Sequence, residues 1–176
     1  KADAQALPFE DAAFDLVCCQ FGAMFFPDRQ SGYREAKRVL KPGGCFLFSV
    51  WDRIEENVFA NDVTNALAEI FPSDPPRFLA RTPHGYHDTA LIRSDLEKAG
   101  FSSVVIDTRA DQSRASSPRN PAVAYCQGTP LRNEIEARDA TKLEAATDFA
   151  ASRIANRHGS GEVGAKIQAH VIVAVA

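Results

Sequence analysis

Long apolar runs and a strong charge of either sign are absent from this chain of 176 residues. No apolar run reaches the roughly 18 residues that a membrane-spanning helix needs. The opening segment is polar and lacks the apolar stretch of a signal peptide. The net charge of −3 gives no electrostatic support for binding nucleic acids or a membrane surface. We therefore expect a globular, cytoplasmic protein with neither of these partners.

The cysteines also lack the spacing of a metal-binding motif. The cysteines are Cys18, Cys19, Cys45 and Cys126. Adjacent cysteines suit neither an ordinary disulfide nor a zinc site. The apolar, strand-like runs around most of the cysteines favour small core residues in a reducing compartment. No bound metal is expected.

Methionine is almost absent, since Met24 is the only one. A complete gene product normally begins with methionine unless it is trimmed, but this chain opens on Lys1. The stretch that follows, DAQALPFEDAAFDLV, is a polar loop that leads directly into an apolar run, with no earlier element for that run to pack against. We expect Lys1 to be an internal start, as in a fragment or a cleaved chain.

A βαβ unit is the clearest structural pattern that is present. Phe14–Phe21 and Cys45–Trp51 are short apolar runs typical of strands that are buried on both faces. Between them lies a helix that Asp28 can cap, followed by the turn residues KPGG. Strands joined by such a crossover should be parallel. The fold class expected is α/β, a sandwich with three layers.

Helices and strands also follow in the second part of the chain. Thr141 and Glu144 have capping-box spacing, and Gly100 and Gly159 are expected helix ends. The expected elements are a helix over Arg53–Phe71, a proline-rich loop over Pro72–Asp88, a helix over Asp88–Gly100, a strand over Phe101–Asp111, a helix over Thr141–Gly159 and a strand over Ala165–Ala176. Two insertions, about 53–88 and 112–163, interrupt the core elements where a substrate cap would be built.

The residues around this βαβ unit resemble a known family. The segments DAQALPFEDAAFDLV and EAKRVLKPGGCFLFSVWD, and more weakly DLEKAGF, are similar to the later part of class I S-adenosylmethionine-dependent methyltransferases with a C-methyltransferase-like domain. The resemblance implies a Rossmann-like methyltransferase sheet, with 1–176 as a partial domain and S-adenosylmethionine as cofactor.

The resemblance also implies a missing part. In this family a glycine-rich loop after the first strand holds the methionine portion of the cofactor, and an acidic residue after the second strand holds the ribose, as in dinucleotide folds. Neither motif is in this sequence. We expect about 60 further residues, at roughly 30 per βαβ unit, in front of Lys1.

Cofactor-binding residues carry over from the family by position. Asp3 and Ala4 match the pair that contacts adenine, since a carboxylate can accept from the exocyclic amine and a backbone N–H can donate to a ring nitrogen. Cys19, Gln20 and Phe21 end the first predicted strand, where open α/β sheets bind ligands. An ordinary turn for Asp3 and core packing for Phe21 are the alternatives.

Substrate residues are less sharply indicated. Trp51 could form a substrate wall or pack in the core, and the following Asp52 could merely cap a helix. His84 and Tyr86 lie in the proline-rich loop and Tyr125 in the second insertion, where they could line a pocket. His87 is a weak candidate for a catalytic base, because histidine titrates near neutral pH.

The function favoured is methyl transfer from S-adenosylmethionine to a small-molecule acceptor. One alternative is a non-catalytic binding or assembly module, because the strand at Phe14–Phe21 would leave an unpaired apolar edge that could drive self-association. A dinucleotide oxidoreductase is a weaker alternative, because the layered fold is shared. The sequence leaves open whether carbon, nitrogen or oxygen is methylated.

Overall fold

The computed structural model describes residues 1–176 and divides them into two compact units. The sheet unit comprises Lys1–Asp52, Tyr86–Arg109 and Ala169–Ala176. The helical unit comprises Arg53–Gly85 and Ala110–Gln168. The ranges of the helical unit lie near those of the two predicted insertions, and its role as a substrate cap stays a prediction.

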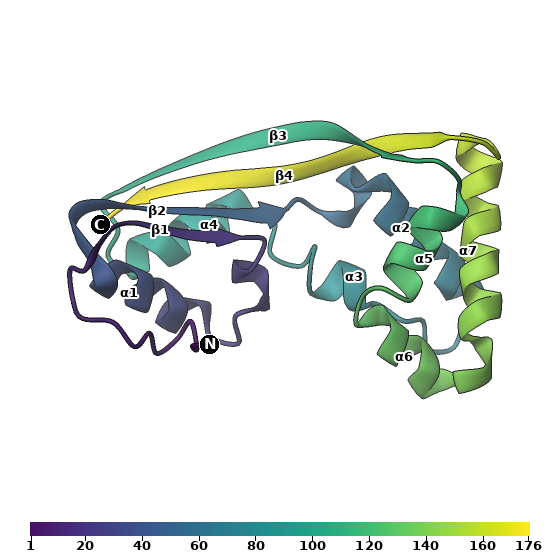
Figure 1. The fold of residues 1–176 in the computed structure, drawn as a ribbon, viewed down its shortest axis with the longest axis horizontal. Helices are drawn as coiled ribbons and strands as arrows, with labels where there is room; N and C mark the ends of the chain where they lie inside the picture. The colour runs from purple at the N-terminus through teal and green to yellow at the C-terminus, as the bar shows by residue number, and fades with distance from the viewer. The chain divides into compact units, whose positions relative to one another are not determined.

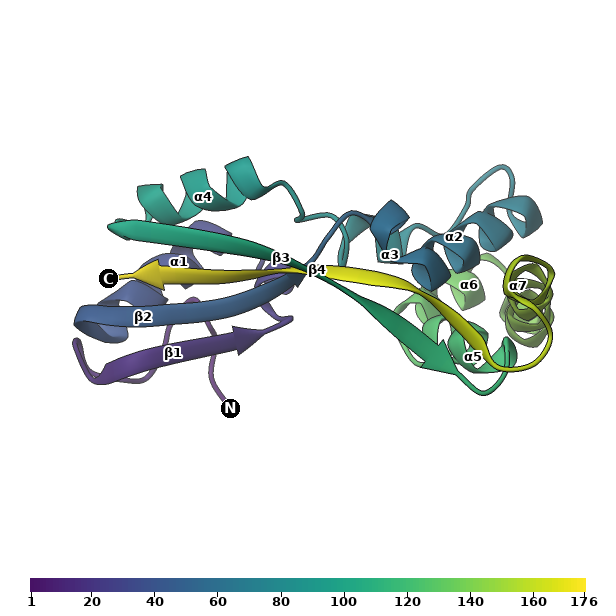
Figure 2. The same cartoon turned by 90° about the horizontal axis from the view of Figure 1, so that it is seen from above.

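Four strands form one sheet in the order β1-β2-β4-β3 (Figure 1). Their bounds are β1 Phe14–Gln20, β2 Leu40–Trp51, β3 Ser103–Ala115 and β4 Val163–Val175. β1 is parallel to β2, and β4 is antiparallel to β2. Figure 2 shows β3 and β4 running in opposite directions. The parallel pairing of β1 and β2 confirms the predicted βαβ unit, whose crossover helix is α1 (Arg29–Val39).

The KPGG segment lies inside β2, so the prediction that this strand begins at Cys45 was wrong. Phe14 pairs with Leu40, whereas Leu16 pairs with Cys45, so the residues between Leu40 and Cys45 bulge out of the ladder. Gly43 has φ +78°, a left-handed conformation that glycine adopts without strain. A Cβ on Gly44 would lie 2.9 Å from the carbonyl oxygen of Lys41. The two glycines therefore permit a bulge that other residues would resist.

One face of the sheet carries the core of the sheet unit. On β2, buried side chains alternate with half-exposed ones, as expected for a strand with one covered face. Helices α1 and α4 (Thr89–Lys98) cover that face and lie on the same side of the strands (Figure 1). The core residues include Tyr33, Ala36, Phe46, Phe48, Val50, Ile92, Leu96, Ile172 and Ala174.

The other face of the sheet is not covered by any helix of the sheet unit. Leu16 on β1 and Val105 on β3 expose 53% and 61% of their surface. β1 is also an edge strand, which agrees with the expected edge, although self-association through it stays a prediction. The fold is the predicted α/β fold, and the sheet unit shows two of its three expected layers.

Several helix ends follow the predicted capping residues. The Asp28 carboxylate accepts a hydrogen bond from Ser31 N, and that of Asp88 accepts from Ala90 N and Leu91 N. Gly100 and Gly159 follow α4 and α7 (Leu143–His158) with φ values of +94° and +99°. These features confirm the predicted N-cap at Asp28 and the predicted helix ends at Gly100 and Gly159.

The predicted capping box at Thr141 and Glu144 is wrong. The N–H and hydroxyl of Thr141 both donate to the Asp139 carboxylate, at 3.0 and 2.6 Å, in the short 3₁₀ turn η3 (Ala140–Lys142). Glu144 instead binds Arg119 and Gln127 on another helix. Helix α7 therefore begins only at Leu143, without a side-chain cap.

The helical unit has its own core, to which the side chains of Phe59, Val63, Leu67, Ile135 and Ile154 contribute. Besides α7 and η3 its elements are η2 Ile54–Glu56, α2 Val58–Ile70, α3 Phe78–Arg81, α5 Arg119–Cys126 and α6 Leu131–Arg138. None of the helices in the chain combines the length and the apolar character needed to cross a bilayer.

Two predictions in this region need correction. The expected continuous helix over Arg53–Phe71 is interrupted at Asn57, whose side-chain amide pairs with the backbone N–H and C=O of Gln168 at 3.2 and 3.1 Å. The expected loop contains a short helix, α3, whose first amides donate to the Glu134 carboxylate. Both differences depend on partners distant in sequence.

Candidate functional site

The carboxyl ends of β1 and β2 lie side by side and form the centre of the site. The backbone N–H of Phe21 donates to both the carbonyl oxygen and the hydroxyl of Ser49, each at 3.1 Å. Phe21 has φ +50°, a left-handed conformation that costs a residue other than glycine about 1–3 kcal/mol. Its ring stacks on Trp51, with ring centroids 4.0 Å apart and planes inclined by 17°. The strained residue thus presents an aromatic wall at the end of the parallel strands.

Cys19 and Gln20 precede this wall on β1. Burial raises the pKa of the Cys19 thiol, while the backbone N–H groups of Gly22 and Ala23 oppose that rise. Gln20 is exposed. Both residues border a cavity of about 310 Å³, which is also lined by Cys18, Leu47, Phe48, Ser49 and Val171. A mostly apolar cavity beside a strand end suits the hydrophobic part of a small ligand.

Asp3 and Ala4 lie in a tight turn near the start of the chain. Asp3 Oδ1 accepts from Gln5 N at 2.9 Å, and the carbonyl oxygen of Asp3 accepts from Ala6 N at 3.1 Å. The Gln5 side chain accepts from Asp28 N at 2.7 Å, which fastens the turn to the start of α1. Asp3 is exposed and Ala4 half-buried, so both remain accessible to a ligand.

A pair of charged residues on α1 holds the segment after this turn. Glu35 Oε2 accepts from Leu7 N at 2.8 Å, and Arg38 donates to the carbonyl oxygens of Leu7 and Phe9 at 3.0 and 2.8 Å. Arg38 also bonds Glu35 and Asp11. We call Glu35 and Arg38 the α1 clasp. It joins two motifs, LPF and RVLKPGG, that are far apart in sequence, and sequence reasoning missed it.

A third group lies at the end of β2. Asp52 and His170 expose 8% and 4% of their surface. His170 Nε2 lies 3.2 Å from Asp52 Oδ1, within the range of an ion pair, but the geometry is not that of a hydrogen bond and Nε2 has no other hydrogen-bond partner. His170 Nδ1 lies 2.9 Å from the hydroxyl of Thr108. A buried polar atom without a hydrogen bond costs about 1–3 kcal/mol in stability. The position of His170 Nε2 therefore calls for a structural or functional explanation.

Comparisons with known proteins agree with this arrangement. A protein-family model described as "Methyltransferase domain" matches residues 1–48, which contain the Asp3 turn, β1, the α1 clasp and part of β2. Residues 1–48 are thus similar to a methyltransferase domain. The cofactor of this family is S-adenosylmethionine.

Curated relatives of the chain are named for quinone biosynthesis. A ubiquinone/menaquinone biosynthesis C-methyltransferase from Paraburkholderia phymatum is 33% identical over 110 residues, which cover 58% of this chain and 45% of that protein. A demethylmenaquinone methyltransferase from Mycolicibacterium vanbaalenii is 31% identical over 111 residues, covering 58% and 49%. The chain therefore spans about half the length of the curated relatives it matches.

Solved structures share the fold of the methyltransferase domain. The BH2331 protein from Bacillus halodurans has a TM-score of 0.55 at 19% identity, covering 99% of this chain and 69% of that one. The YcgJ protein from Bacillus subtilis has a TM-score of 0.51 at 17% identity, covering 98% and 68%. At these identities the likeness shows the fold alone.

The predicted substrate residues fall in different units. Trp51, Tyr86 and His87 belong to the sheet unit, whereas His84 and Tyr125 belong to the helical unit. His84 is buried, and burial raises the pKa of the half-buried Tyr125. His87 is half-buried just before α4. The catalytic role of His87 and the substrate roles of the others stay predictions.

Tyr86 is the predicted residue with the least access to a ligand. It is 1% exposed in the core of the sheet unit. Its hydroxyl donates to Asp95 Oδ2 at 2.8 Å and lies 3.3 Å from the hydroxyl of Tyr33. Burial first, and the neighbouring Tyr33 next, raise the pKa of Tyr86. In this structure Tyr86 joins α4 to the core.

The α1 clasp should respond to acid in a defined range. The hydrogen bonds from Arg38 and from Leu7 N lower the pKa of Glu35 from 4.5 to about 2. Its stabilising contribution is therefore fully present above pH 4.5 and is lost as the pH falls through about 2. We expect the Leu7 amide resonance in ¹H–¹⁵N spectra to titrate with a midpoint near pH 2, and Glu35→Gln to abolish that titration. A midpoint near 4.5 would show that the clasp does not form.

Proposed function

We propose that this protein transfers a methyl group from S-adenosylmethionine to a small-molecule acceptor. The observation that carries the proposal is the strained Phe21 at the adjacent carboxyl ends of the parallel β1–β2 pair. Ligands of open α/β sheets bind outside the carboxyl ends of such strands. The match to the methyltransferase family model over the same residues supports the assignment.

The residues at this site fit the chemistry of the cofactor. The Asp3 carboxylate can accept from the exocyclic amine of adenine, and Ala4 N–H can donate to a ring nitrogen. Backbone carbonyls at Cys19 and Gln20 can accept from the amino group of the cofactor. The Phe21 ring offers a flat apolar surface against which the adenine can pack. The α1 clasp contributes by holding the segment that follows the Asp3 turn against α1.

Alignment is the main catalytic contribution expected of these residues. S-adenosylmethionine supplies an electrophilic methyl group when it is bound. Holding the acceptor in line with that group supplies about 7–11 kcal/mol in well-oriented reactions. The Trp51 ring, which stacks on Phe21, would hold an acceptor from one side and exclude water from it.

The acceptor we propose is a planar, phenol-like ring that is methylated on carbon. Two features support it: the flat aromatic wall of Phe21 and Trp51, and curated relatives whose names specify C-methyltransfer in ubiquinone and menaquinone biosynthesis. An aromatic wall favours a ring over a flexible aliphatic amine, because aromatic pairs gain energy beyond their area of contact.

A binding or assembly module is the second candidate. The unpaired edge of β1 and the exposed Leu16 favour it, since such edges recruit other strands. In that case the chain would self-associate through β1 and would bind no cofactor. Light scattering at micromolar concentration distinguishes the two, because only the assembly module requires a dimer.

Calorimetric titration with S-adenosylhomocysteine tests the proposed function. We expect heat of binding with S-adenosylhomocysteine and none with NADH, which serves as the matched control for the third alternative, an oxidoreductase. Heat with NADH alone would contradict methyl transfer. No heat with either ligand, together with a dimer in light scattering, would favour the assembly module.

A further inference from the structure

Three polar side chains, two on strands and one just after a strand, form a continuous chain in the sheet unit. Asp52 follows β2, His170 lies on β4 and Thr108 on β3. His170 Nε2 is 3.2 Å from Asp52 Oδ1, and His170 Nδ1 is 2.9 Å from Thr108 Oγ1. Because both ring nitrogens face a neighbouring oxygen, the imidazole links the carboxylate to the hydroxyl.

The inner end of this chain directly follows the carboxyl end of β2. His170 pairs with Val50, and Asp52 follows Trp51, whose ring stacks on Phe21. His170 is 4% exposed, and its Nε2 has no hydrogen-bond partner. Buried polar atoms in folded proteins are nearly always bonded, so an exception beside a ligand site points to a role in the chemistry.

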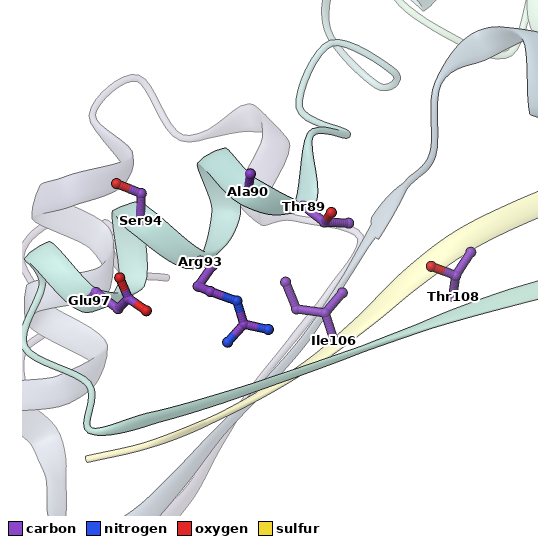
Figure 3. Close-up of a pocket in the computed structure, with 7 residues that line it drawn as sticks. All are labelled: Thr89, Ala90, Arg93, Ser94, Glu97, Ile106 and Thr108. Carbon is purple, nitrogen blue, oxygen red and sulfur yellow. The ribbon is translucent and has the colours of Figure 1, made fainter.

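The outer end of the chain is open to solvent. Thr108 is exposed and lines a groove of about 450 Å³ between α4 and β3. Figure 3 shows Thr108 and Ile106 on the strand side of this groove, with the Arg93 guanidinium reaching towards β3 from α4. Arg93 donates to the carbonyl oxygen of Val104 at 2.6 Å, which ties α4 to β3 beside the groove. Water in the groove can therefore reach the Thr108 hydroxyl.

We propose that Asp52, His170 and Thr108 form a proton relay that leads from the methyl acceptor to this groove. The proposal rests on the proposed function and deepens it, because a relay is useful only to an acceptor that loses a proton, such as a phenol. It also assigns Asp52 as the group that receives the proton, with His170 and Thr108 as positioning residues that pass it on.

The O–H bond of the acceptor breaks, its proton goes to an Asp52 oxygen, and the electron pair stays on the acceptor. The ring carbon would then take the methyl group, and the electrons of the broken carbon–sulfur bond would go to sulfur. The C–H bond at the methylated carbon then breaks, its electron pair restores the aromatic ring, and the acceptor oxygen regains a proton. Asp52 passes its proton to His170 Nε2, and Nδ1–H releases one to Thr108 and the water of the groove.

The relay predicts one tautomer of His170 at rest. With Nδ1–H donating to the Thr108 hydroxyl, the Nε2 lone pair faces Asp52 and is ready for a proton. In the alternative, the contact has only a structural role. The Nε2–H group then always faces the carboxylate, and the Thr108 hydroxyl donates to Nδ1. The two arrangements place the ring proton on different nitrogens of His170, and NMR distinguishes them. Asp52 is the titratable group within ion-pair distance of His170.

Ring-nitrogen NMR of histidine-labelled protein tests the relay without any substrate. We expect Nδ1–H in the wild type, a shift of the tautomer equilibrium in Thr108→Val, and its recovery in Thr108→Ser, which restores the hydroxyl. Ser102→Ala removes a hydroxyl that bonds Val175 at the start of the same strand and should change nothing at His170. An Nε2–H tautomer that is indifferent to Thr108→Val would overturn the relay.

A kinetic comparison separates the relay from the proposed function. Asp52→Asn should lower kcat for a phenolic acceptor by about 10²-fold, the lower range for general acid–base catalysis, while S-adenosylhomocysteine affinity stays within about twofold. Thr108→Val should lower kcat less, and Thr108→Ser should restore it. If the wild type binds no S-adenosylhomocysteine, the proposed function fails and the acceptor assignment with it. If it binds and methylates, but Asp52→Asn keeps full kcat, the relay alone fails.

Discussion

Replacing Phe48 with alanine is expected to lower the free energy of unfolding by about 3–5 kcal/mol. Phe48 is 1% exposed, stacks on Phe46 with ring centroids 4.8 Å apart, and lies 5.5 Å from the ring of Tyr33. It therefore joins β2 to α1 at the centre of the sheet unit. Removing the ring leaves a cavity that neighbouring aromatic rings cannot fill without leaving their rotamers. Urea denaturation followed by circular dichroism measures the change.

A matched phenylalanine provides the control for this prediction. Phe25, in the short turn η1 (Ala23–Phe25), is 50% exposed, so Phe25→Ala should change the free energy of unfolding by about 0.5 kcal/mol or less. Equal losses for the two variants would show that Phe48 does not lie in a packed core. The covered face of the sheet would then be assigned wrongly.

Replacing Arg38 with alanine is expected to have the largest effect on cofactor affinity. Arg38 donates to two backbone carbonyls and two carboxylates, so its loss frees the segment after the Asp3 turn and leaves Glu35 without its main partner. A displacement of about 1 Å in a positioned group can change rates by up to about 10²-fold. We expect S-adenosylhomocysteine affinity, measured by calorimetry, to fall at least about tenfold.

Two further variants show whether the geometry of Arg38 or only its charge matters. Arg38→Lys keeps the charge but not the planar fork of donors, so it should rescue little of the affinity. Arg34→Ala removes an arginine on the same helix that bonds only the nearby Ser31 hydroxyl, and should leave affinity unchanged. If Arg34→Ala weakened binding as much as Arg38→Ala, a general charge effect would replace the clasp.

The βαβ unit could be predicted from sequence because its signals are local. Apolar runs at Phe14 and Cys45, a capping aspartate at Asp28 and a glycine pair at Gly43 each act within a few residues. The structure confirms the predictions drawn from these signals, except that β2 begins at Leu40 and contains a bulge. That bulge depends on pairing with β1, which no local pattern reveals.

Predictions failed where a partner that the pattern did not consider, near or distant in sequence, competed for a residue. Thr141 has the correct spacing for a capping box, but Asp139 takes its N–H and hydroxyl. Asn57 interrupts a helical pattern because the backbone of Gln168 offers two hydrogen bonds. Sequence periodicity cannot weigh such contacts, which exist only once the chain has folded.

The residues of the candidate site also differ in whether the sequence could predict them. The Asp3 turn and Phe21 could be named from a resemblance, because they belong to contiguous motifs. The α1 clasp and His170 could not, since Glu35 meets Leu7 across 28 positions and His170 meets Thr108 across 62. The i, i+3 spacing of Glu35 and Arg38 was a visible signal, but it indicated only a helix-surface ion pair.

Mapping S-adenosylhomocysteine binding by ¹H–¹⁵N NMR on the assigned protein tests the cofactor site most directly. We expect chemical-shift changes centred on five residues: Asp3, Ala4, Cys19, Gln20 and Phe21. Changes confined to the helical unit, or none at millimolar ligand, would contradict a cofactor site at the carboxyl end of β1.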